Sequence, residues 1–192
     1  MARKKVDMRE LFDATGQLLL ERGYGGFHFG ALSERLGVGR STIYEYFRSK
    51  EQLILAYMND LMGKVLAECE KQGALPPLDR LRNWLSVFMR YSHIQRIFQS
   101  LPFLDPTESP EAEAFMRKLF QDHKKLYVMI EQTIEEAKDA GVIRKSVPTG
   151  LLTAMIFSSV YLPEVMGPGQ SVSGEDFLDL LHRGFEPRGD GD

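Results

Sequence analysis

Apolar residues recur at every third or fourth position along almost the whole chain, which is the period of an amphipathic α-helix. No stretch alternates convincingly between apolar and polar residues, and no hairpin signal occurs. The pattern therefore predicts an all-α fold of about nine helices. We expect the first helix to begin at Asp7, where Glu10 completes a capping box, and to end at Gly23.

Two short helices separated by a tight turn are expected next, over residues 29–36 and 40–47. Gly37 stops the first of them, because glycine adopts a left-handed turn at the least steric cost. Gly39 is an acceptable N-cap for the second. Cap and breaker residues divide the remaining chain into five further helices, which we expect over residues 50–72, 78–100, 110–140, 148–164 and 174–185.

The charge distribution separates the first fifty residues from the rest of the chain. Taken whole, the 192 residues have a net charge of −3, which argues mildly against a nucleic-acid binder. Residues 1–50 contain 9 Lys and Arg against 6 Asp and Glu, whereas residues 51–192 contain 15 against 21. A head of net charge +3 on a body of net charge −6 predicts two parts with different tasks.

Residues 31–47 have the pattern of a helix-turn-helix, in which a tight turn containing glycine joins two short helices. Leu32, Leu36 and Ile43 are apolar residues that would hold both helices against the first helix. The second short helix presents mainly polar and aromatic groups between residues 40 and 46. Arginine can bind guanine or a phosphate through two donors, and hydroxyl groups donate to phosphate oxygens. The segment therefore predicts a DNA-binding surface.

These residues resemble the TetR family of bacterial one-component regulators. The resemblance covers about residues 9–55 and rests on Ala14, Leu18, Glu21, Arg22, Gly23, Tyr24, Leu32, Gly37, Val38, Thr42, Ile43, Tyr44, Phe47, Lys50 and Leu53. It implies an all-helical homodimer with an N-terminal three-helix DNA-binding domain and a C-terminal helical domain for ligand binding and dimerisation. We accordingly place the first domain at residues 1–50 and the second at residues 51–192.

The resemblance also implies which residues face double-stranded operator DNA. We expect contacts from His28, Gly39, Arg40, Ser41, Thr42, Tyr44, Glu45, Tyr46 and Lys50. His28 stands where the family often has a capping threonine, and Gly30 where a polar residue is common. Glu45 either accepts from cytosine N4 or faces solvent or an ion-pair partner, since a carboxylate repels phosphate. Residues 3–5 are basic and either add phosphate contacts or form a disordered tail.

A small-molecule effector of the body is implied as well, in a largely apolar pocket among the helices at 78–100, 110–140 and 148–165. Tyr and Trp rings combine an apolar body with a polar tip, which suits orienting contacts. We expect the lining to include Trp84, Phe88, Tyr91, Phe103, Tyr127 and Tyr161. Ordinary core packing is the alternative for these residues. Asp122 and His123 either contribute to a ligand site or lie on a solvated helix face.

The last two helices are the candidates for a dimer interface. The first of them is apolar on most sides and the second carries an apolar stripe, so both must be buried. Two such hairpins can form a four-helix bundle about a two-fold axis. The expected interface residues are Leu152, Met155, Ile156, Val160, Phe177, Leu180 and Leu181. Burial within one subunit is the alternative.

No enzymatic, metal-dependent or membrane function is indicated. The four histidines lack metal-ligand spacing, and Glu34 and Arg40 replace the glycine and lysine of a nucleotide-binding loop. Cys69 has no neighbouring catalytic partner, and the longest near-apolar run, residues 151–162, is far shorter than the ~18 residues of a membrane span. We predict a cytoplasmic transcriptional regulator without a cofactor, most simply a repressor. The alternative is a helical ligand-binding or interaction protein with weakened DNA binding.

Overall fold

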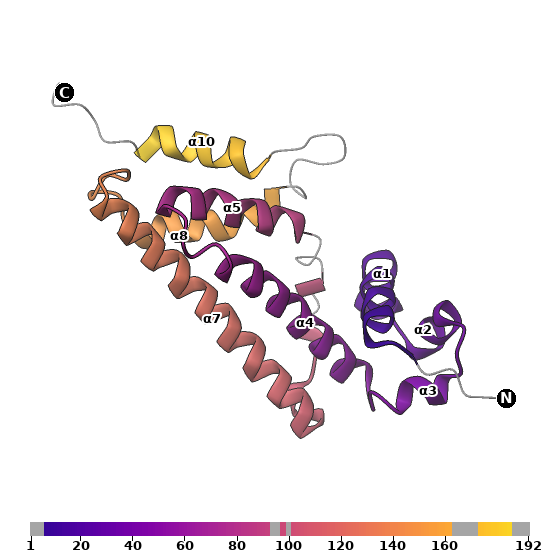
Figure 1. Ribbon diagram of the computed structural model, residues 1–192. Helices are drawn as coiled ribbons and strands as arrows, with labels where there is room; N and C mark the ends of the chain where they lie inside the picture. Colours follow the sequence, from indigo (N-terminus) through magenta and orange to yellow (C-terminus); the bar gives the residue numbers. More distant parts are fainter. Residues whose placement is uncertain (1–5, 93–96, 99–100, 163–172, 186–192) are drawn as a thin grey trace. The chain divides into compact units, whose positions relative to one another are not determined.

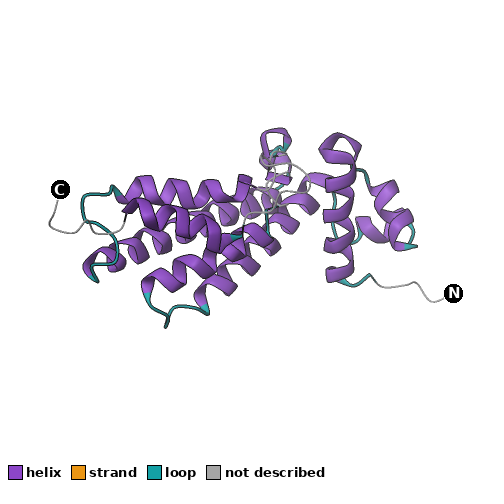
Figure 2. Cartoon of the chain, turned by 90° about the horizontal axis from the view of Figure 1, so that it is seen from above, coloured by secondary structure: helices purple, strands orange, loops and turns teal. Residues whose placement is uncertain are grey.

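The computed structural model describes residues 6–92, 97–98, 101–162 and 173–185 (Figure 1). Within these ranges the regular structure consists of eight α-helices and three short 3-10 helices, and Figure 2 shows no strand in them. The all-α prediction is therefore confirmed. The chain divides into two compact units, one formed by residues 1–62 and 93–121 and the other by residues 63–92 and 122–192. The functional boundary expected at residue 50 stays a prediction, and the basic residues 3–5 lie outside the described ranges.

The first unit begins with three helices, α1 (Met8–Gly26), α2 (Phe29–Leu36) and α3 (Arg40–Tyr44). The Asp7 carboxylate caps α1 by accepting hydrogen bonds from the backbone amides of Arg9 and Glu10, as the sequence predicts. Gly23 has a φ of 64°, so the regular part of α1 does break at this glycine. The core of the three helices consists of side chains that are almost wholly buried, among them Leu11, Leu18, Leu32, Ile43 and Phe47.

The long helices α4 (Lys50–Glu70) and α7 (Pro110–Asp139) have residues in both units. In the first unit, the amide nitrogen of Asn59 donates to the carbonyl oxygen of Phe115 over 2.7 Å, which ties α4 to α7. Two 3-10 helices, η1 (Leu101–Phe103) and η2 (Pro106–Glu108), precede α7 in this unit. Ser109 caps α7 by accepting from the amide of Ala112.

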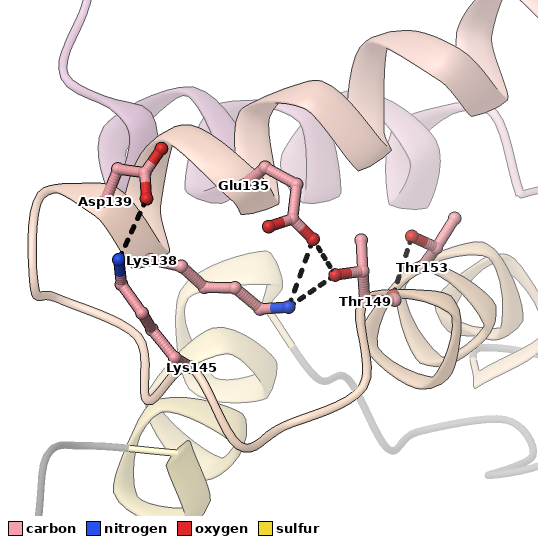
Figure 3. A network of polar contacts seen from close by, with 6 residues as sticks. All are labelled: Glu135, Lys138, Asp139, Lys145, Thr149 and Thr153. Carbon is pink, nitrogen blue, oxygen red and sulfur yellow. Dashed lines mark hydrogen bonds and ion pairs between the residues drawn. The ribbon is translucent and has the colours of Figure 1, made fainter.

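The second unit adds α5 (Pro77–Arg90), α8 (Thr149–Ser158), the 3-10 helix η3 (Ser159–Tyr161) and α10 (Gly174–Phe185). α10 packs on α5, and Gly174 permits the close approach, because a Cβ there would lie 2.7 Å from the Ser86 nitrogen. Ser173 and Asp176 form the predicted reciprocal cap of α10. At the other end of the unit, buried Lys138 on α7 donates to Glu135 and to Thr149 at the start of α8 (Figure 3).

Three helices end three or more residues earlier than their apolar period predicts. α5 ends at Arg90 instead of residue 100, because Ser92 donates to the Met89 carbonyl in a tighter turn. α8 ends at Ser158 instead of residue 164, where the hydroxyls of Ser158 and Ser159 bond back to carbonyls of the preceding turn. α3 ends at Tyr44 instead of residue 47, since Tyr46 bonds the carbonyl three residues earlier.

Candidate DNA-binding and effector sites

The turn between α2 and α3 fixes the direction of the second helix. Gly37 adopts the left-handed conformation with a φ of 63°, and its amide donates to the carbonyl of Glu34. The amide of Val38 donates to the carbonyl of Ser33 over 3.0 Å. This pair of bonds ends α2 and turns the chain into α3, which begins one residue after Gly39. The segment from α2 to α3 is therefore a helix-turn-helix.

Most of the predicted DNA-contacting side chains of α3 are exposed. Arg40, Ser41, Tyr44 and Glu45 lie at the surface, with Tyr44 54% exposed. The edge of the Tyr44 ring contacts Phe29 on α2, with the ring centroids 4.9 Å apart, so its orientation is fixed. Tyr46 is half-buried, and Thr42 is buried with Ile43 in the core. The structure thus gathers an arginine, a hydroxyl, a phenol and a carboxylate on one short exposed helix.

His28 is exposed at the start of α2, where it replaces the capping threonine of the family pattern. Its Nδ1 accepts a hydrogen bond from the backbone amide of Ala31 over 3.1 Å, so the imidazole caps the helix. With Nδ1 accepting, the proton of the neutral ring lies on Nε2, which leaves that nitrogen a hydrogen-bond donor. The substitution by histidine therefore keeps the cap.

Lys50 opens α4 and contacts the end of α1. Its Nζ lies 3.8 Å from the centroid of the Tyr24 ring and donates to the Tyr24 carbonyl over 3.3 Å. The Tyr24 hydroxyl in turn donates to Glu51 over 2.6 Å. The ring of Phe103 in η1 stacks on the Tyr24 ring, with the centroids 5.9 Å apart. Four residues of the first unit thus join α1, α4 and η1.

The second unit contains a cluster of four rings, formed by Phe88, His123, Tyr127 and Phe157, which we call the aromatic cluster. The ring of Phe157 stacks with each of the other three, at centroid distances of 5.2 Å to His123, 5.5 Å to Tyr127 and 6.1 Å to Phe88. Partial burial lowers the pKa of His123, which favours the neutral imidazole. Sequence reasoning selected Phe88 and Tyr127 but missed Phe157 as their partner.

The other four predicted effector residues are not members of the aromatic cluster. Trp84 is buried and donates to the carbonyl of Cys69, and the Tyr91 hydroxyl donates to Glu68. Phe103 belongs to the first unit and is 67% exposed, and Tyr161 is exposed in η3. Trp84 also borders a hollow of about 200 Å³ together with Cys69, Arg80, Met129, Thr133 and Glu136.

The predicted interface residues differ in how far they are buried. Leu152, Ile156 and Leu181 are buried within the chain itself, and Val160 and Phe177 are half-buried. Met155 and Leu180 remain exposed, with Leu180 71% accessible to solvent, and Leu151 and Tyr161 are also exposed. α8, η3 and α10 therefore still present large apolar side chains at the surface.

Three observations bear on enzymatic and membrane alternatives. Burial raises the pKa of the Cys69 thiol to about 12, so it is protonated at neutral pH and is a poor nucleophile. Among the described residues, no three His, Cys, Asp or Glu side chains form a group that could hold a metal ion. No helix in the same ranges has the length and apolar character needed to cross a bilayer.

Comparison with known proteins assigns the helix-turn-helix to a family. Residues 11–57 match the family model for bacterial regulatory proteins of the tetR family. The N-terminal part of the chain, residues 11–57, belongs to the TetR family. The matched range contains α2 and α3 and reaches into α4, so it includes all of the expected DNA-contacting residues. The matched family is one of bacterial regulatory proteins, so the chain carries the DNA-binding domain of a transcriptional regulator.

Three relatives of this TetR-family chain are similar over nearly its whole length. The fatty acid metabolism regulator protein of Bacillus subtilis (strain 168) is 20% identical over 161 residues, which are 83% of this chain and 82% of that protein. The structure of the transcriptional regulator FadR from Bacillus subtilis in complex with stearoyl-CoA has a TM-score of 0.67 at 18% identity, covering 94% of this chain and 100% of that chain. The structure of AibR in complex with isovaleryl coenzyme A and operator DNA has a TM-score of 0.68 at 21% identity, covering 94% and 98%. The two structures share the fold of this chain.

Proposed function

We propose that this TetR-family regulator is a cytoplasmic repressor that binds a palindromic operator as a homodimer and is released by the coenzyme A thioester of a fatty acid. The observation that carries the proposal is the exposed surface of α3, where Arg40, Ser41 and Tyr44 lie on the second helix of a helix-turn-helix. In this motif the second helix enters the major groove, and a dimer reads two half-sites about one helical turn apart.

Dimerisation is supported by the apolar surface that the single chain leaves uncovered. Leu151, Met155 and Leu180 are exposed on α8 and α10, which are the last two helices of the chain. A large patch of exposed apolar residues on a protein surface often marks an interaction site. A two-fold interface built from the same elements of both copies would cover these side chains and set the spacing of the two heads.

An acyl-CoA effector is supported by the relatives and by the chemistry of the second unit. The two related structures are complexes with stearoyl-CoA and isovaleryl coenzyme A, and the related protein is a regulator of fatty acid metabolism. The aromatic cluster offers apolar ring faces from α5, α7 and α8, with the Tyr127 hydroxyl and the His123 imidazole as polar groups. We infer that an acyl chain would bind beside these rings, because effector pockets combine mostly apolar walls with a few polar groups.

Release requires that the effector binds two states of the protein with different affinity. We infer that the effector favours a state in which the heads are wrongly spaced for the operator. The contact of Tyr24 with Lys50 and Phe103 supports a relay inside the first unit, because η1 belongs to the segment between α5 and α7. Any change that reaches η1 through the chain would alter the position of Tyr24.

The experiment is a mobility-shift assay with the DNA upstream of the protein's own gene, at several salt concentrations. We expect a shifted band that weakens steeply as salt rises, and its disappearance on addition of stearoyl-CoA. Free coenzyme A and stearate are the ligand controls, and Phe157→Ala is the variant that should bind DNA but resist release. If no genomic fragment gives a shifted band at low salt, the DNA-binding part of the proposal is refuted. If the shifted band persists with acyl-CoA of every chain length, the acyl-CoA effector is refuted.

A further inference from the structure

Gly30 on the first turn of α2 lies against the guanidinium of Arg40. A Cβ built on Gly30 would lie 2.5 Å from Nη2 of Arg40 and 3.1 Å from its Nε. The same Cβ would lie 3.1 Å from Nδ1 of His28. The guanidinium of Arg40 therefore occupies the space that a side chain at residue 30 would fill.

The backbone of α2 does not itself require glycine at this position. The positive φ angles in the described chain belong to Gly23, Gly37 and Gly141, and Gly30 is not among them. A glycine inside a helix is less favourable than alanine, because it loses more conformational freedom on folding. The benefit of Gly30 must therefore come from what approaches it, and the structure places Arg40 there.

The Arg40 guanidinium lies here because Gly30 has no side chain to fill the space, and no ion pair with a described residue holds it. In the part of the chain that the structure describes, its guanidinium has no hydrogen bond or ion pair, and the residue is exposed. Its donors are therefore available to DNA, while the surface at Gly30 limits where the long side chain can lie. A side chain that is ordered before binding loses less entropy when it binds.

We propose that Gly30 is a positioning residue that sets the place of the Arg40 guanidinium and thereby the sequence preference of α3. The inference rests on the proposed function, since it concerns the same DNA-binding surface. It also explains why glycine stands where a polar residue is common in the family. Any larger residue at position 30 displaces the guanidinium, and the displacement is easy because the end of an arginine side chain is flexible.

The test compares Gly30→Ala, Arg40→Ala and the double variant with the wild-type chain. Gly25→Ala is the matched control, because a Cβ on Gly25 meets nothing within 4 Å. Affinity is measured by fluorescence anisotropy on the upstream DNA fragment that shifts in the mobility assay and on a scrambled duplex, and the melting temperature Tm is measured in parallel. A good base contact by arginine corresponds to about a 5- to 150-fold preference for the right sequence, which Arg40→Ala should remove.

We expect Gly30→Ala to lose a large part of this preference while its Tm stays equal to or above that of the wild type, and the double variant to bind like Arg40→Ala alone. Loss of affinity together with a lower Tm, or an equal loss in both Arg40 backgrounds, would overturn the inference. A Gly30→Ala variant that prefers the operator over the scrambled duplex as strongly as the wild type would also overturn the inference. Because Gly25→Ala changes a glycine with free space around it, it should behave as the wild type in each assay.

A measurement without DNA separates this inference from the proposed function. The order parameter of the Arg40 Nε–H bond, measured by nuclear magnetic resonance, should fall in Gly30→Ala if Gly30 positions the guanidinium. An unchanged order parameter and chemical shift would overturn the inference even if the operator is bound. If the order parameter falls but the wild type binds no operator, the proposed function fails and the positioning by Gly30 stands.

Discussion

The ammonium group of Lys50 lies 3.8 Å from the centre of the Tyr24 ring and donates a hydrogen bond to the Tyr24 carbonyl. The contact joins the first residue of α4 to the end of α1, so the charge expected to meet a DNA phosphate is fixed by the three-helix head. An ammonium over an aromatic face contributes about 0.5–1 kcal/mol at an exposed site. Lys50 is thus both a candidate phosphate contact and part of the packing between two helices.

Lys50→Met should reduce the salt dependence of operator binding. Each phosphate neutralised by a protein contributes about 0.9 to the slope of log K against log salt concentration, so we expect a loss of about 0.9 for each protomer. The slope is measured by anisotropy titrations over a series of salt concentrations. Lys71→Met removes an exposed charge just beyond α4 and serves as the control. Equal slopes for the two variants would show that Lys50 does not contact a phosphate.

Phe103→Ala should uncouple the effector from DNA release and leave operator affinity nearly unchanged. The ring stacks on Tyr24 but is 67% exposed, so its removal should cost little stability. The measurement is the stearoyl-CoA concentration that half-releases the operator, which should rise. Phe120→Ala is the control, because Phe120 is also largely exposed in the first unit and lies on α7. Wild-type release by Phe103→Ala would exclude the Tyr24 stack from the relay.

The partial burial of His123 makes part of the stability depend on pH. Because burial lowers its pKa from 6.5, the unfolded chain binds the proton more readily than the folded chain. Stability from this residue is full above pH 6.5 and falls as the pH drops through the lower pKa of the folded state. Urea unfolding is measured at pH 7.5 and at pH values below 6.5. The free energy of unfolding should fall less between these pH values for His123→Gln than for the wild type. Identical losses in the two proteins would show that His123 does not contribute to the pH dependence of stability.

Leu180→Glu should convert the proposed dimer into monomers. Leu180 is 71% exposed in the single chain, so a carboxylate there costs little stability within one subunit but is costly when buried between two. Sedimentation should give a particle of 21.9 kDa for the variant and twice that mass for the wild type. Leu75→Glu, at another exposed leucine, should remain dimeric. A wild-type chain that is already monomeric would contradict the proposed interface.

The sequence predicts the features that depend on neighbouring residues. The cap at Asp7, the left-handed Gly37 and the reciprocal pair Ser173–Asp176 follow from local hydrogen bonds, and each is present. The end of α5 after Arg90 was missed because no glycine or proline marks it. α8 likewise ends where serine hydroxyls donate hydrogen bonds to backbone carbonyls, and the spacing of apolar residues does not reveal these hydrogen bonds.

The candidate sites show the same limit in their long-range contacts. Spacing placed Thr42 beside Arg40 and Ser41, yet a five-residue helix turns too little for its pattern to tell that Thr42 is buried. Phe157 joins rings from two other helices, and only the fold brings these residues together. The sequence identified Gly30 as a departure from the family pattern, but its reason is a guanidinium ten residues away along the chain.

We propose that operator and acyl-CoA compete through two states of one protein. Isothermal titration of stearoyl-CoA into the protein, with and without saturating operator, tests it most directly. Linkage requires that the operator weakens stearoyl-CoA binding by the same factor by which stearoyl-CoA weakens operator binding. We predict a several-fold higher Kd for stearoyl-CoA in the presence of the operator. The same Kd in both titrations would contradict the account.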